Sequence, residues 1–308
     1  MCATKVSKVS QDGQFVEHVC GWRPTMSVDS VTAREQLQDG TRAWKDYARR
    51  SPFREIWEYR ELFFFLAWRD VKIRYKQTVL GVLWVIIQPL FTMMIFTVVF
   101  GRIANISSEG VPRPVFYFSA LLPWIYFSTT VTGAGMSLVS NAGLLAKIYF
   151  PRIILPAAAA LVPLVDFLIG SAFLIGFILF YDIPIGWNLL LWPILVVPLA
   201  LLAFGLGALL AALNVRYRDV KYAISFGIQL LLFVSPIIYP SSFFPEQYRW
   251  LLALNPLSGL IETFRYAVVP TYPVDWGVVG ISVGVTAVLF VLGVLYFKRT
   301  EKAFADII

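Results

Sequence analysis

Side chains that usually carry bond chemistry are scarce in this sequence. Its one histidine, His18, and its two cysteines, Cys2 and Cys20, lie in a polar N-terminal segment. They are too few for a histidine-based metal site, a catalytic triad or a disulfide scaffold. The phosphate-binding pattern G-x-x-x-x-G-K-[ST] does not occur, so we expect neither an ATP site of that kind nor an enzyme active site.

One carboxylate draws attention because its surroundings are apolar. Asp166 follows Pro163 by one turn within the run 153–181, which carries no other charge. An ionisable residue inside a membrane is costly and is a functional candidate. The alternative is a structural one, in which nearby serine or backbone groups satisfy the carboxylate. A proton relay would need ionisable partners in the other apolar runs, which have none, so a proton-coupled carrier is not expected.

The elements that position these groups are predicted to be membrane helices. The 308 residues are 58% hydrophobic and 15% charged, whereas soluble domains average about 45–50% apolar and about 25% charged residues. The net charge is +7, and 14 of the 26 lysines and arginines precede residue 80. No apolar segment in the first 30 residues resembles a cleavable signal peptide. We predict an all-α integral membrane protein.

Six apolar runs reach the roughly 20 residues that cross a bilayer. They are 79–100, 115–146, 153–181, 183–215, 222–245 and 276–297. With both termini in the cytoplasm, the cytoplasmic segments hold 22 lysines and arginines and the outer segments hold 4, as the positive-inside rule requires. Because the cations flank apolar runs, they indicate membrane topology rather than nucleic-acid binding.

Composition divides the chain into four parts. Residues 1–50 form a polar cytoplasmic tail, 51–78 an amphipathic helix, 79–297 the transmembrane domain and 298–308 a cytoplasmic tail. A basic, tryptophan-rich amphipathic helix before a span is expected to lie in the headgroup layer. It could also pack on a soluble partner, and the two interpretations are compatible.

The segment 236–275, between the fifth and sixth runs, is too apolar for a solvated loop and too short in its apolar parts to span. We predict re-entrant helices that form an outer gate, with an ordinary outer loop as the alternative. The candidate gate residues are Tyr239, Pro240, Phe243, Phe244, Asn255 and Pro256.

Aromatic side chains gather near the start of the second run. Tyrosine and tryptophan side chains are typical of a membrane interface. Aromatic faces also contact the apolar faces of sugars, while tyrosine and tryptophan donate hydrogen bonds to sugar hydroxyls. Composition does not separate an aromatic belt from a sugar-polymer lining. The candidate lining residues are Tyr117, Phe118, Trp124, Tyr126 and Phe127.

The cytoplasmic loop 141–152 combines apolar, aromatic and basic residues on a predicted turn. Such a surface is typical of a docking site for a soluble partner, although it could equally anchor the loop to lipid. The candidate docking residues here are Asn141, Lys147, Tyr149, Phe150 and Arg152.

Several motifs in order resemble the ABC-2 type permeases that export O-antigen, teichoic acid and capsule glycans. They are Trp68 to Lys76, Leu80-Gly81-Val82-Leu83-Trp84, Gln88-Pro89-Leu90, Leu122-Pro123-Trp124, Phe150-Pro151-Arg152, Asn214 to Asp219, Ser235 to Pro240 and Leu254-Asn255-Pro256. The resemblance covers residues 53 to about 297. The 50-residue tail before it is longer than we expect for this family.

The resemblance implies a homodimer in a bacterial inner membrane with two copies of a separate ATPase, which binds ATP and magnesium. A glycan on a polyprenyl diphosphate would pass through a channel at the dimer axis. Arg69, Lys72, Arg74 and Lys76 would hold the diphosphate at the entrance, although their role in setting the membrane topology is by itself sufficient to explain them. Arg216, Arg218 and Asp219, in the second cytoplasmic loop, would join the coupling residues of the first.

Other functions remain as alternatives to glycan export. An ABC-2 exporter of drugs or another small lipophile has similar requirements. A membrane enzyme acting on polyprenyl phosphates would need clustered carboxylates or histidines, and no D-x-x-D pair follows residue 80. The sequence does not distinguish O-antigen from teichoic acid or capsule.

Overall fold

The computed structural model describes residues 56–76, 83–145, 147–148, 150–245, 247 and 249–301, which are helical with short connections and belong to one unit, Ser51–Ile308. Among these residues, five helical segments are long and apolar enough to cross a membrane. They are α4 (Leu83–Phe96) with its π-helical extension η1 (Thr97–Ile103), α5 (Arg113–Ser140), α7 (Ile154–Phe180), the 3-10 turn η2 (Trp187–Leu190) with α8 (Leu191–Arg216), and α12 (Trp276–Thr300). Five of the six predicted spans are thereby confirmed in length and composition.

The sixth predicted span, over 222–245, is wrong in its bounds. Its helix, α9, covers Val220–Val234 and has 15 residues, which gives about 23 Å at 1.5 Å per residue. It ends because Pro236 disfavours the α conformation for the residue before it, and Ser235 is extended with ψ of 146°. The chain then continues through η3 (Ser241–Phe243) into two short helices, α10 (Arg249–Leu254) and α11 (Pro256–Val268).

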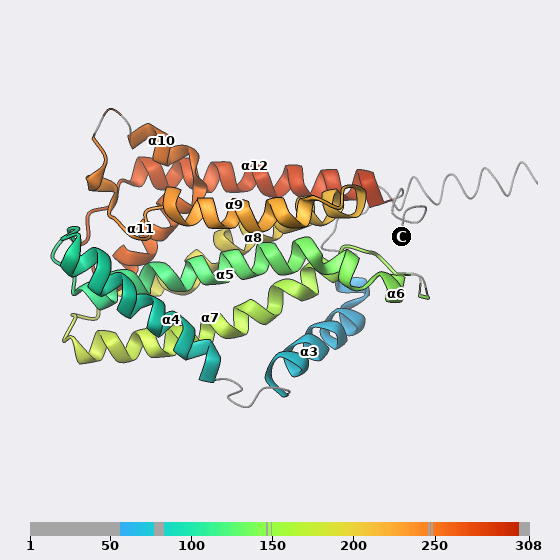
Figure 1. Ribbon diagram of the computed structural model, residues 1–308, viewed down its shortest axis with the longest axis horizontal. Coiled ribbons are helices and arrows are strands. Elements are labelled where there is room, and N and C mark those ends of the chain that lie inside the picture. The colour runs from blue at the N-terminus through green and yellow to red at the C-terminus, as the bar shows by residue number, and fades with distance from the viewer. Residues whose placement is uncertain are drawn as a thin grey trace, which may run out of the picture. The chain divides into compact units, whose positions relative to one another are not determined.

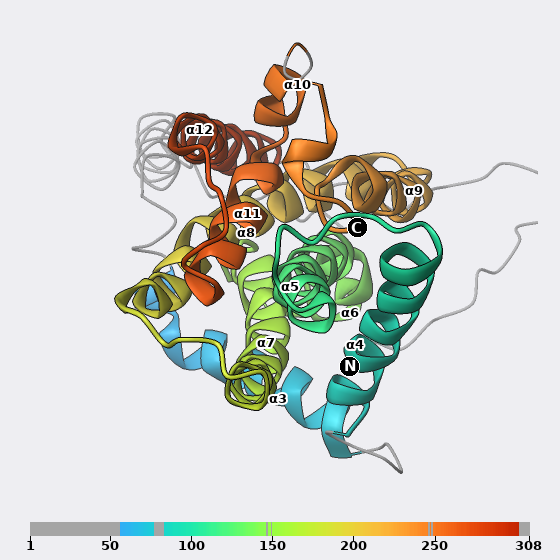
Figure 2. The same cartoon turned by 90° about the vertical axis from the view of Figure 1, so that its left-hand side faces the viewer.

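Helix α5 is the centre of the bundle. It packs against α4, α7, α8, α9 and α11, and Figure 2 shows it enclosed by its neighbours when the bundle is viewed along the helices. Two ends can be named from Figure 1. The α6 end holds α6 (Ala142–Leu145), the α8–α9 turn and the last turn of α12, and the α11 end holds α10 and α11.

Within the segment 51–78, predicted to be an amphipathic helix, the structure has the helix α3 (Arg60–Lys76), which lies along α7. Leu66 and Ala67 are buried, whereas Phe64, Phe65 and Trp68 are exposed on other faces. Cations accompany the exposed indoles, since Lys72 Nζ lies 5.7 Å from the centre of the Trp68 ring. Aromatic rings with nearby cations suit the headgroup layer of a membrane.

Helices α8 and α12 approach each other most closely at two glycines. A Cβ atom added to Gly293 would overlap the carbonyl oxygen of Gly205, and one added to Gly205 would press on the backbone of Phe290. Small residues permit close contact between membrane helices, where dispersion and weak polar contacts stabilise the pair. The positions of α8 and α12 therefore depend on the absence of side chains at both glycines.

We expect Gly293→Ala to destabilise the bundle by about 1–3 kcal/mol, because the added methyl group pushes α12 away from α8. Gly284→Ala is the matched control, since a Cβ at Gly284 on the same helix meets no atom within 4 Å. Both changes gain the same helix propensity. Thermal unfolding of the purified variants in detergent checks this, and equal melting temperatures would contradict the glycine contact.

Candidate functional site

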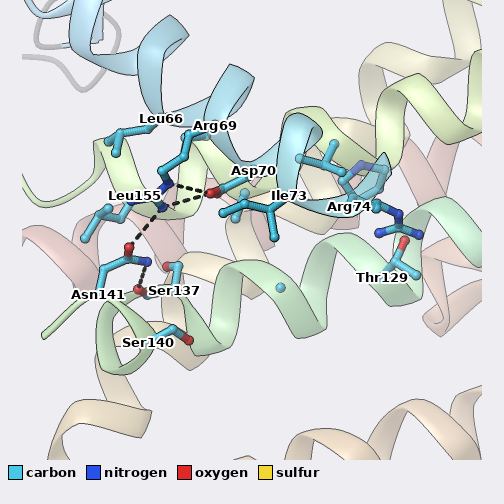
Figure 3. A pocket seen from close by; sticks show the side chains of 15 residues that line it. Leu66, Arg69, Asp70, Ile73, Arg74, Thr129, Ser137, Ser140, Asn141 and Leu155 are labelled. Atoms are coloured by element: carbon cyan, nitrogen blue, oxygen red, sulfur yellow. Dashed lines mark hydrogen bonds and ion pairs between the residues drawn. The ribbon is translucent and has the colours of Figure 1, made fainter. Parts of the chain in front are cut away.

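A groove of about 590 Å³ lies between α3, α5 and α7. Figure 3 shows Arg69, Asp70 and Arg74 entering it from α3, opposite Thr129 and Ser137 of α5. Its apolar walls come from Leu66, Ile73, Leu155, Val162 and Pro163. A groove with polar groups on one side and apolar walls can hold a molecule that has a charged head and a hydrocarbon part.

The polar wall of α5 follows from the spacing of its small residues. Thr129, Gly133, Ser137 and Ser140 recur every three or four positions and so share one helix face. The threonine and serine hydroxyls donate to carbonyl oxygens one turn earlier, as the Ser137 hydroxyl does to the Ala134 carbonyl at 2.7 Å. These donors are satisfied within the helix, while their oxygen lone pairs remain available in the groove.

Arg69 ties α3 to the end of α5. Its Nε donates to the Asp70 carboxylate at 2.9 Å and its Nη2 donates to the Asn141 side-chain oxygen at 3.0 Å. Asn141 in turn donates to the Ser137 carbonyl at 2.9 Å. Asn141 was predicted to couple to an ATPase, and the structure places its side chain in this groove.

Asp166 is paired across the α3–α7 contact. Its Oδ2 lies 2.6 Å from Nη2 of Arg74, and its other oxygen accepts a hydrogen bond from the Tyr75 hydroxyl. Burial and the hydrogen bond to Asp166 raise the pKa of Tyr75 above its usual range, so this hydroxyl stays protonated as a donor at neutral pH. The expectation that serine or backbone groups near Pro163 satisfy Asp166 is therefore wrong.

The four cations predicted to hold a diphosphate divide into two pairs. Arg69 and Arg74 line the groove. Lys72 and Lys76 are exposed on α3 and do not line it. The structure thus brings two of the four side chains together at one site.

The candidate coupling residues at the α6 end are in different environments. Phe150 is buried among residues of α3, α5 and α7, so its side chain is unavailable for docking in this conformation. The backbone N–H and Nη1 of Arg152 donate to Glu301 at 2.9 and 2.7 Å, which fastens the loop to the end of α12. Tyr149 lies outside the described residues. The exposed candidates are Lys147, Arg216, Arg218 and Asp219.

The five aromatic residues predicted to line a polymer path are buried inside the bundle. Phe118 packs on Phe177 of α7, and Tyr126 packs on Phe167 of the same helix. A polymer could touch these rings only if the bundle opened, so the lining role stays a prediction. The five residues are Tyr117, Phe118, Trp124, Tyr126 and Phe127.

Most of the predicted gate residues gather at the α11 end. Tyr239, Phe243 and Phe244 form a cluster with ring centres 5.3–6.2 Å apart, beside the buried Pro240. Asn255 caps α11 by accepting the N–H of Leu257 at 3.1 Å, and Pro256 occupies the first helical position. The structure thus shows two short helices and an aromatic turn, while their gating role stays a prediction.

Two charged residues that sequence reasoning missed hold this turn in place. Arg265 is 1% exposed. Its Nη2 donates to the Ile237 carbonyl at 2.8 Å and its guanidinium lies 3.8 Å from the centre of the Phe116 ring. Glu262, also buried, accepts the N–H of Ser241 at 2.9 Å. Their three-residue spacing on an apolar helix was the available signal, since it places both on one side of α11.

Comparison with known proteins gives the family context. The family model described as "ABC-2 type transporter" matches residues 61–269. The O-antigen export system permease protein RfbA of Klebsiella pneumoniae is 28% identical over 244 residues, covering 78% of this chain and 92% of that protein. The protein of the same name from Myxococcus xanthus is 31% identical over 215 residues, covering 69% and 82%.

A more distant relative is named for a different cargo. The polysialic acid transport protein KpsM of Escherichia coli is 24% identical over 247 residues, covering 76% of this chain and 92% of that protein. The residues that match the family model, 61–269, run from α3 to the end of α11.

We expect Arg265→Met to destabilise the α11 end by about 3–5 kcal/mol, because it removes the partner of buried acceptors and leaves Glu262 buried without a nearby cation. Arg102→Met removes an exposed arginine from η1 and is the matched control. Thermal unfolding and protease cleavage within 235–248 measure the effect. Equal protection of the two variants would contradict the role assigned to Arg265.

Proposed function

The chain belongs to the ABC-2 type transporter family as a transmembrane permease subunit, and we propose that it exports a polysaccharide attached to a polyprenyl diphosphate. The observation that carries this proposal is the groove between α3, α5 and α7, into which two guanidinium groups point. The names of the three relatives support a glycan cargo, since two are named for O-antigen export and one for polysialic acid transport.

The groove suits a lipid diphosphate in charge and in position. Guanidinium groups bind phosphate oxygens through short, charge-assisted hydrogen bonds, and both Arg69 and Arg74 line the groove. The exposed aromatic residues of α3 would keep this helix in the cytoplasmic headgroup layer. The diphosphate would enter there while its prenyl chain stays in the bilayer.

Assembly with other subunits is the second part of the proposal. Two copies of this chain would form the channel at their shared axis, and each would receive one copy of a separate ATPase that binds ATP and magnesium. Lys147, Arg216, Arg218 and Asp219 are exposed at the α6 end and would contact the ATPase. This requires both termini on the cytoplasmic side of a bacterial inner membrane, as the 22 to 4 distribution of lysine and arginine favours.

The α11 end would then face outward and close the channel. Its aromatic turn is held by Arg265 and Glu262, and short helices can bury their apolar sides against a bundle within the outer leaflet. Opening would require Tyr239 to release the carbonyl oxygens of Phe233 and Val234, to which its hydroxyl donates at 2.8 and 3.0 Å.

Deletion of the gene tests the cargo. We expect one surface polysaccharide to disappear while its lipid-linked form accumulates in the inner membrane, because synthesis continues and export stops. Extraction of both pools and separation by gel electrophoresis measures this, with complementation by the intact gene as the control. The sugar composition of the lost polymer separates O-antigen from teichoic acid and capsule. Normal amounts of both pools, with no second copy of the gene, would favour a small lipophile as cargo.

Single neutral substitutions in α3 test the groove. We expect Arg69→Gln to reduce export roughly tenfold or more, since a hydrogen bond to a charged group contributes about 1.5–3 kcal/mol. Lys72→Gln removes the same charge from the same helix outside the groove and is expected to have little effect. Export is measured at equal amounts of permease in the membrane. A similar loss in the two variants would exclude a special role for the groove.

A further inference from the structure

The pairing of Asp166 suggests a part that it plays in choosing the lipid, and this inference rests on the proposed function. We propose that Asp166 is an exchangeable counter-ion. Its carboxylate pairs with the Arg74 guanidinium when the groove is empty. A diphosphate displaces this carboxylate, whereas a phosphodiester does not. Asp166 would then determine which membrane lipids enter.

The two partners of the ion pair differ in accessibility. The side chain of Arg74 is 43% exposed and that of Asp166 is 9% exposed. Arg74 lines the groove, whereas Asp166, on α7, does not. A guanidinium has five N–H donors, and the ion pair engages Nη2. An anion in the groove can therefore approach Arg74 before the carboxylate leaves.

The charges around the groove are balanced. Arg69 lies 2.8 Å from a carboxylate oxygen of Asp70, and Arg74 is paired with Asp166. Two cations thus face two anions. This balance avoids an unpaired charge in apolar surroundings when no lipid is bound. It also means that a lipid anion competes for the arginines with carboxylates that already hold them.

The need to displace Asp166 from Arg74 discriminates between phosphodiesters and diphosphates, because they differ in charge. A phosphodiester headgroup carries one negative charge on its phosphate, as the Asp166 carboxylate does, so exchanging one for the other yields little Coulomb energy. A diphosphate carries at least two, and its attraction to Arg74 and Arg69 is correspondingly larger at the same distance. The bulk phospholipids, which far outnumber the cargo, would thereby be excluded.

Tyr75 makes the exchange feasible. Its hydroxyl donates to the Asp166 oxygen that does not contact Arg74. When Arg74 turns to the lipid, Asp166 keeps this hydrogen bond, which offsets part of the cost of leaving the carboxylate without its cation. Adjacent residues of α3 thus supply both the exchangeable partner and the permanent one.

Binding by the purified full-length permease in detergent tests the proposal. The probes are farnesyl diphosphate, a soluble isoprenyl diphosphate, and phosphatidylglycerol, a phosphodiester lipid that competes with it. We expect Asp166→Asn to bind phosphatidylglycerol roughly tenfold more tightly than the unchanged protein, while its affinity for farnesyl diphosphate rises less. The ratio of the two affinities therefore falls. Asn keeps the shape of the side chain and can still accept from Tyr75.

Two further variants separate this role from a structural one. Asp182→Asn removes an exposed carboxylate that follows the last residue of α7, whereas the groove is lined by the first turns of that helix. This change is expected to leave the ratio unchanged. Arg74→Gln is expected to weaken farnesyl diphosphate binding and to abolish the effect of Asp166→Asn when the two are combined. Melting temperatures of all variants, measured without lipid, report stability separately from selectivity.

The outcomes distinguish this inference from the function on which it rests. If the unchanged permease binds farnesyl diphosphate and Asp166→Asn leaves the ratio the same, the counter-ion role is overturned and the groove stands. If the unchanged permease fails to bind farnesyl diphosphate, both the counter-ion role and the diphosphate entrance are overturned. A lower ratio in Asp166→Asn alone, abolished by Arg74→Gln, supports the proposal.

Discussion

The need to pair charges in apolar surroundings determines how this bundle is held together. An isolated ionised side chain in a low-dielectric medium costs several kcal/mol, so each one must find a partner within reach. Asp166 finds Arg74 and Tyr75 on α3, and Arg265 finds the Ile237 carbonyl and the face of Phe116. Both contacts join a long helix to a shorter segment, and so they fix the position of α3 and of the turn that holds Tyr239, Phe243 and Phe244.

The same constraint gives the two ends different properties. At the groove, the guanidinium of Arg74 is half-exposed and the Asp166 carboxylate with which it pairs is buried. In such an arrangement the exposed partner can exchange the buried one for a ligand. At the α11 end, Arg265 and Glu262 are both almost inaccessible, so their contacts are expected to persist unless the whole turn moves. The first arrangement suits the proposed lipid entrance, and the second suits the proposed outer gate.

Sequence patterns predicted the long helices because length, apolarity and flanking charge are local properties. They failed where tertiary contacts decide. One error was local: the run 222–245 looked like a full span, but Pro236 ends its helix at Val234. The partner of Asp166 was missed because Arg74 lies in the amphipathic segment, outside every apolar run, and only the packing of α3 on α7 brings them together. Phe150 looked like an exposed docking residue, and the same packing buries it.

Asn141 links the groove to the loops at the α6 end. Its side chain holds Arg69, while the chain directly after it forms α6 and the loop that Arg152 fastens to Glu301. A displacement of this loop would therefore move Asn141 relative to α3 and change how Arg69 is held. Hydrogen bonds such as the one between Asn141 and Arg69 can transmit a displacement only if the helix that they join has two discrete arrangements. The proposed exchange of partners at Arg74 would give α3 two such arrangements, so lipid binding and movement of the loop would act on the same helix.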